Sequence, residues 1–99
     1  MQTLIRRFEN LETIDLEVLE EEITFLAKNL EILRITDKIS NDAFLDAGMI
    51  QGGLTTISNL LSQGLKTQDV KGQLKRLKDK AIVLGDSYPE LDQLIESMR

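Results

Sequence analysis

The residues that could do chemistry in this 99-residue chain are few in kind. The sequence has no histidine and no cysteine, which removes the commonest general base near neutral pH, thiolate nucleophiles and nearly every zinc site. A serine nucleophile would then need a lysine as its base, and the serines and threonines lie in no recognisable motif of that kind. We therefore expect no enzyme activity and no bound cofactor.

Three consecutive glutamates, Glu20 to Glu22, form the most compact group of carboxylates and suggest a metal or cation site. Consecutive residues of a helix point in different directions, so these carboxylates do not converge on one ion. They favour a solvated acidic face, and the sequence predicts no metal site. It also has no glycine-rich loop of the type that cradles phosphates.

One short segment is basic in a chain whose net charge is −5. Residues 66–80 hold six basic and two acidic residues, whereas residues 1–65 and 81–99 are acidic. Residues 57–80 can be written as a helix, a turn at Gly64 and a second helix, which is similar to the spacing of a helix-turn-helix unit. In that interpretation the basic side chains contact phosphates. They are Lys71, Lys75, Arg76 and Lys78.

Several residues disagree with the helix-turn-helix pattern. Leu60 stands where the close crossing requires a small residue, and Asn59, Gln63 and Gln73 stand where apolar packing is expected. The rest of the chain is acidic and would repel DNA. A DNA-binding regulator is therefore kept as the alternative function.

The basic segment has a second interpretation, in which it pairs with acidic side chains. Glu17 and Glu20 to Glu22 lie in the first half of the longest predicted helix. Placed beside it, within the chain or across a dimer, Lys71, Lys75 and Lys78 would face these carboxylates. Each exposed pair would contribute only about 0–1 kcal/mol, so the pairing would set orientation more than stability.

The longest helix is predicted over residues 15–34. Its main apolar stripe follows steps of three and four residues, which keeps the side chains on one side of the helix. The stripe consists of Leu16, Leu19, Ile23, Leu26, Leu30 and Leu33. A second row, Val18, Phe25 and Ile32, widens the apolar surface to roughly half the circumference. We interpret this helix as the spine of a bundle, and its stripe as part of an interface with a second copy or a partner.

The elements on either side of the spine follow from local signals. An amphipathic helix is predicted over residues 3–12, and Thr13 or Asp15 is expected to cap the spine. Polar residues at Ser40, Asn41 and Asp42 are expected to reverse the chain.

The second half of the chain is expected to form shorter helices. Two glycines, Gly52-Gly53, predict a break between helices over residues 43–51 and 54–63. Thr67 is expected to cap a helix over residues 68–84 that Gly85 ends. Serine followed three residues later by glutamate, at 87 and 90, predicts a capping box for a short last helix. The apolar face of that helix holds Leu91, Leu94, Ile95 and Met98.

Residues 47–65 carry no charge, and three interpretations compete for them. A membrane span is disfavoured by Gln51, Asn59 and several hydroxyls. The Gly48-x-x-x-Gly52 spacing, which allows close helix contact in lipid, is a weak signal alone. We favour a buried helix pair whose glycines form a turn and allow close packing.

Together these patterns predict an all-α protein, an antiparallel bundle of four or five helices with one long central helix, forming one domain over residues 1–99 and self-associating. We expect a small cytoplasmic interaction module, an adaptor, regulator or assembly subunit that contacts itself or a partner protein. No membrane span is expected. Nucleic acid is a partner only under the alternative.

Overall fold

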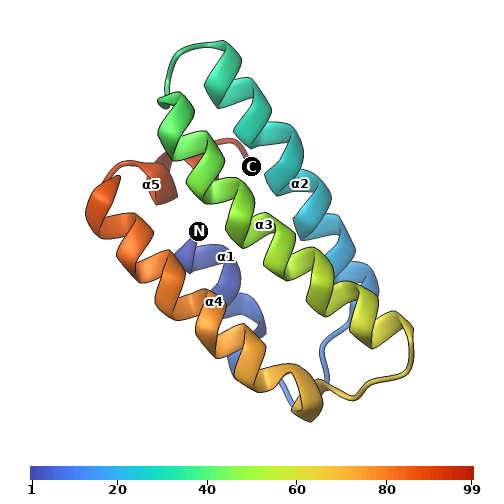
Figure 1. Cartoon of the computed structure of the whole chain (residues 1–99). Helices are drawn as coiled ribbons and strands as arrows, with labels where there is room; N and C mark the ends of the chain where they lie inside the picture. Colours follow the sequence, from blue (N-terminus) through green and yellow to red (C-terminus); the bar gives the residue numbers. More distant parts are fainter.

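The computed structural model describes residues 1–99 and contains five helices and no strands. They are α1 (Gln2–Glu9), α2 (Leu16–Ile35), α3 (Asn41–Ser62), α4 (Thr67–Ser87) and α5 (Leu91–Glu96). The three long helices run antiparallel to their neighbours, with α3 between α2 and α4 (Figure 1). α1 packs against α4, and α5 touches α1 and α2. The predicted all-α bundle of four or five helices is confirmed.

The core is one cluster of 20 buried apolar residues to which all five helices contribute. The predicted stripe of α2 faces this cluster, because Leu19, Leu26, Leu30 and Leu33 are at most 1% exposed. Burying one such leucine contributes about 1.5–3 kcal/mol, so these four side chains are a large part of what holds α2 in place.

Polar side chains cap the starts of α2 and α3: of the two caps expected for α2, Asp15 is the one used, and α3 begins at Asn41, two residues before the predicted start. The Asp15 carboxylate accepts hydrogen bonds from the backbone N–H groups of Glu17 and Val18, at 3.0 and 3.3 Å. Ser40 caps α3 by accepting from the N–H of Ala43 at 3.1 Å. Thr67, which was expected to cap α4, is instead its first residue. Its hydroxyl accepts from the N–H of Ile14 and so joins α4 to the segment before α2.

The predicted break at Gly52-Gly53 is wrong, because α3 is continuous over 22 residues. A Cβ on Gly53 would lie 2.4 Å from a methyl carbon of Leu77 in α4. Gly53 therefore serves close packing between α3 and α4, and this packing outweighs the low helix propensity of glycine. α3 contains most of the uncharged stretch. No helix in the chain combines the length and apolar content that a membrane crossing requires.

Two expectations near the end of α4 are also wrong. Gly85 does not end the helix, which continues to Ser87. A Cβ at Gly85 would approach the Gln2 amide to 2.6 Å, so the glycine makes room for the start of α1. Ser87 does not cap α5, because it is the last residue of α4 and three residues separate the two helices.

The expected pairing of acidic α2 with basic α4 does not form within the chain. α2 and α4 lie on opposite sides of α3 (Figure 1). Lys78 pairs with Glu9 of α1, and Glu22 pairs with Arg7 and Arg99. The order of the helices decides this outcome, since α3 separates the two charged segments.

Candidate functional site

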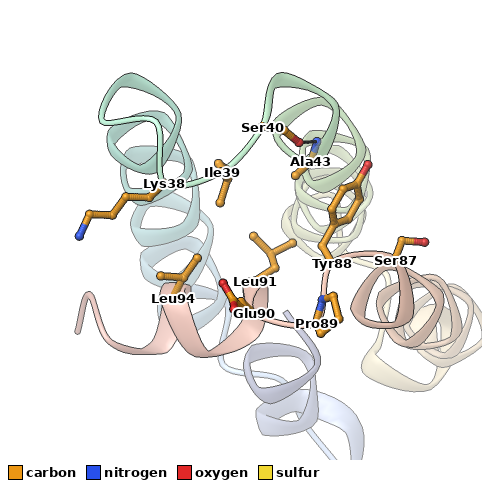
Figure 2. Close-up of a pocket in the computed structure, with 10 residues that line it drawn as sticks. All are labelled: Lys38, Ile39, Ser40, Ala43, Ser87, Tyr88, Pro89, Glu90, Leu91 and Leu94. Carbon is orange, nitrogen blue, oxygen red and sulfur yellow. Dashed lines mark hydrogen bonds between the residues drawn. The ribbon is translucent and has the colours of Figure 1, made fainter.

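A cleft of about 310 Å³ lies at the end of the bundle where the α2–α3 turn meets the α4–α5 linker. We call it the end cleft. The antiparallel arrangement of α2, α3 and α4 places both connections at this end, although they are almost fifty residues apart in the chain. Figure 2 shows its lining residues: Lys38, Ile39, Ser40, Ala43, Ser87, Tyr88, Pro89, Glu90, Leu91 and Leu94.

The middle of the end cleft is apolar and its edge is charged. Ile39 from the turn and Leu91 and Leu94 from α5 point toward a common centre (Figure 2). Leu91 is only 3% exposed, whereas Lys38 and Glu90 are exposed at the edge. The apolar centre could hold one apolar side chain of a partner, and the charged residues at the edge could contact polar residues beside that side chain.

Tyr88 forms one wall of the end cleft. Its hydroxyl donates a hydrogen bond to Asp46 Oδ2 of α3 at 3.0 Å and so fastens the linker to α3. This bond, with partial desolvation and the nearby carboxylates of Asp46 and Asp42, raises the pKa of Tyr88 above its ordinary value. The phenol is therefore protonated near neutral pH and acts as a donor, not as a base.

The remaining polar groups of the cleft are suited to binding. Ser40 Oγ already accepts the N–H of Ala43 as a helix cap, and no hydrogen bond joins Lys38, Ser87 or Glu90 to another lining side chain. Nucleophilic catalysis requires a nucleophile within hydrogen-bond reach of its base, and the cleft contains no such pair. Nowhere in the chain are three or more histidine, cysteine, aspartate or glutamate side chains placed so that they could hold a metal ion.

A charged network joins the last residue to α2. Arg99 donates two hydrogen bonds to the Glu22 carboxylate, at 3.0 and 2.7 Å, and others to Glu96. Its guanidinium also lies 4.3 Å from the centre of the Phe25 ring. The hydrogen bonds that Arg99 donates to Glu22, ahead of those it donates to Glu96, raise the pKa of Arg99 above its ordinary value. The network holds α5 onto the bundle and thereby supports the end cleft.

The other side of α5 is held to α1 through Asp92. Its carboxylate accepts from the amino group of Met1 and from the N–H and hydroxyl of Thr3. Partial burial alone would raise the pKa of Asp92, but these bonds outweigh it and lower the pKa to about 2. Asp92 is therefore ionised over the physiological range.

The six residues predicted as an interface belong mainly to the core. Leu19, Leu26, Leu30 and Leu33 are buried by the chain's own helices, and Leu16 and Ile23 are half-buried. Leu16 lines a hollow at the opposite end of the bundle from the end cleft. Little of the stripe is thus left on the surface of a single chain.

The predicted nucleic-acid contacts do not share one side of α4. Lys71, Lys75 and Lys78 line a hollow beside α1 with Glu9, whose carboxylate pairs with Lys78. Arg76 is exposed and does not line this hollow. α3 and α4 lie side by side over most of their length (Figure 1), whereas the helices of a helix-turn-helix unit cross steeply. DNA binding stays a prediction.

The end cleft was missed at the level of sequence. The turn residues around Ser40 and Pro89 were recognised, but sequence spacing alone does not show that two distant turns meet. The order and direction of the three long helices supply that information. The sequence signal for the end cleft was weak, because it consisted of two apolar residues, Ile39 and Leu94, that lie near turn residues.

Known proteins supply no relative for comparison. Neither a protein-family model, nor a curated protein, nor a solved structure matches this chain.

Proposed function

We propose that this chain is a small, non-enzymatic protein–protein interaction module that takes one apolar side chain of a partner into the end cleft. The observation that supports this proposal is the apolar centre formed by Ile39, Leu91 and Leu94 in a cleft that Lys38 and Glu90 also line. The module acts as an adaptor, regulator or assembly subunit. Its placement in the cytoplasm is part of the proposal.

The size of the cleft limits what it binds. A volume of about 310 Å³ is at the lower end of the range for ligand pockets. One leucine, methionine or phenylalanine side chain buried there contributes about 1.5–3 kcal/mol. This is too little for stable binding, so the residues beside the anchor must also contact the edge. Lys38 favours an acidic neighbour of the anchor, and Glu90 favours a basic one.

Peptide selection tests this proposal without a known partner. Random twelve-residue peptides are displayed on phage, selected on the whole chain and measured by fluorescence anisotropy. We expect enriched peptides with an apolar anchor flanked by charge. Leu94→Glu should weaken their binding at least tenfold, because it places a carboxylate in the apolar centre. Gln93→Glu is the matched control, since it adds the same charge to α5 outside the cleft, and should change binding less than twofold.

A second variant avoids any effect on folding. Lys38 is exposed and forms no ion pair, so Lys38→Glu should leave the melting temperature unchanged. Peptides selected on this variant should lose their acidic neighbour and gain a basic one. If no sequence is enriched, or if enriched peptides bind Leu94→Glu and Lys38→Glu as they bind the parent chain, the end cleft is not the binding site.

A further inference from the structure

The outer side of α3 and the adjoining side of α4 expose apolar side chains that the chain does not cover. Leu45, Met49 and Val83 are 56%, 73% and 64% exposed. Met49 and Val83 line one shallow hollow together with Asp46 and Lys80. We call this surface, from Asp42 to Gly52 on α3 and from Arg76 to Val83 on α4, the outer face. It does not overlap the apolar centre of the end cleft.

Two glycines in the outer face have no explanation within the chain. A Cβ on Gly48 or on Gly52 would have no atom within 4 Å, in contrast to Gly53, where Leu77 lies 2.4 Å away. Glycine inside a helix lowers helix propensity, and here no contact within the chain compensates for it. The lack of a side chain at Gly48 and Gly52 does, however, allow another backbone to approach α3 closely on either side of Met49.

Four charged side chains of the outer face form no ion pair within the chain, although Asp46 accepts the hydrogen bond of the Tyr88 hydroxyl. Asp42, Asp46, Arg76 and Lys80 are exposed, and none of them takes part in an ion pair. Asp42 and Asp46 precede Met49 along α3. Because α4 is antiparallel and Leu77 lies opposite Gly53, Lys80 stands about level with residue 50 and Arg76 with residue 54. Asp42 and Asp46 thus lie on one side of the Met49 level, and Lys80 and Arg76 lie on the other, where Asp79 is the one exposed acidic residue of the outer face.

We propose that a second copy of this chain docks on the outer face, with its α3 antiparallel and a two-fold axis at the level of Met49. The axis brings Lys80 and Arg76 of the second copy to the levels of residues 48 and 44. Measured along the α3 axis at a rise of 1.5 Å per residue, Lys80 and Arg76 of the second copy each lie within about 3 Å of Asp46 of the first copy. Every ion pair then forms twice, as a two-fold interface requires.

The same arrangement accounts for the glycines and the apolar residues. Each Met49 passes beside its counterpart and fills the space over Gly48 and Gly52 of the other copy. Val83 and Leu45 are covered at the edges. A face whose charges change sign about its own centre is complementary to itself, which favours a second copy over an unrelated protein.

Light scattering over a range of concentrations tests the docking. We expect a species of twice the 11.2 kDa chain mass that dissociates on dilution. Met49→Glu should raise the dissociation constant at least tenfold. Ile35→Glu is the matched control, because Ile35 of α2 is similarly exposed at 65% and lies outside the outer face. A chain that is monomeric at every concentration, or a dimer equally insensitive to both variants, overturns the proposal.

A mixing experiment tests the antiparallel arrangement. Asp46→Lys places six positive groups across the axis, and Lys80→Asp places four negative groups beside the two Arg76 side chains, so each variant alone should associate more weakly than the parent chain. Mixed in equal amounts they should associate more strongly than either variant alone, because both pairs formed by residues 46 and 80 are again Lys with Asp. A mixture that associates no more than the separate variants would overturn the antiparallel docking. Asp46→Lys also removes the acceptor of the Tyr88 hydroxyl in the end cleft, so peptide binding is measured on Lys80→Asp, which leaves the residues of the end cleft unchanged. Failure of the mixing experiment then leaves the peptide-binding proposal standing.

Discussion

α2 and α3 are similar in length, at 20 and 22 residues, and both contribute to the core, but their solvent sides differ. The exposed side of α2 carries charge along its length, for example at Glu17, Glu21 and Lys28. The exposed side of α3 carries no charge after Asp46 and includes Leu45 and Met49. The apolar stripe of α2 is thus well covered, and the two apolar side chains that α2 exposes, Val18 and Ile35, lie near its opposite ends. Leu45 and Met49, which α3 exposes, are four residues apart and lie on one side of the helix.

This difference shows that apolar content alone does not identify an interface. The apolar stripe of α2 was predicted to contact a second copy or a partner, yet α3 and the rest of the bundle bury Leu26 and Leu30 almost completely. What distinguishes α3 is the lack of charge on its far side, together with two glycines that no neighbour requires. In the proposed dimer, the residues opposite the stripe are therefore the ones that a second molecule contacts.

The largest expected effect contrasts the two helices directly. Leu26→Ala should lower the free energy of unfolding by about 2–5 kcal/mol, because it leaves a cavity in the core. Met49→Ala should change it by less than about 0.5 kcal/mol in dilute solution, where the chain is monomeric. Urea unfolding of both variants measures this. Equal losses at the two positions would mean that Met49 is covered within the chain.

Two adjacent glycines sharpen the comparison within α3. Gly53→Ala should cost about 1–3 kcal/mol, because the new methyl group meets Leu77. Gly52→Ala should stabilise the dilute chain by about 0.5–1 kcal/mol, because alanine has the higher helix propensity and space is open there. At high concentration Gly52→Ala should also weaken association. Urea unfolding and light scattering on the same samples separate the two effects, and association left unchanged would argue against close docking.

Low pH weakens the contact between α5 and α1 that Asp92 forms, without altering α2 or α3. The folded-state pKa of Asp92 is about 2, below the ordinary value of 3.8, so its ionised form favours folding. That contribution is fully present above about pH 4 and is lost as the pH falls toward 2. The unfolding free energy of Asp92→Asn, measured in urea between pH 2 and 5, should therefore fall less on acidification than that of the parent chain. Parallel curves would show that Asp92 is not a stabilising contact.

The smallest expected effect concerns the basic side of α4. A fluorescent DNA duplex should show no anisotropy change with the chain at 150 mM salt, because Lys71, Lys75 and Lys78 share a hollow with Glu9. Lys71→Glu should then leave the anisotropy of the duplex unchanged as well. Binding that weakens steeply with salt and is lost in Lys71→Glu would revive the DNA-binding alternative and make α4, not α3, the functional helix.

The sequence was sufficient where a local signal decided the structure. The cap at Asp15 and the stripe of α2 predicted that helix, and Gly64, with φ of 102°, follows α3 as expected of a helix terminator. The sequence was insufficient where a residue far away in the chain decided the local structure. Gly53 looked like a helix breaker because its partner, Leu77, lies in another helix. The end cleft needed the same long-range information, since it forms only where two connections meet.

Cross-linking through a single introduced cysteine tests the central claim, that α3 docks on itself at Met49. The chain has no cysteine, so Met49→Cys supplies one thiol per copy. Oxidised glutathione should convert it to a disulfide-linked dimer, because the two-fold axis brings both sulfurs together. Ile35→Cys, at a similarly exposed position, should remain a monomer under the same conditions. Equal dimer formation by both variants, or none by Met49→Cys, would contradict the account.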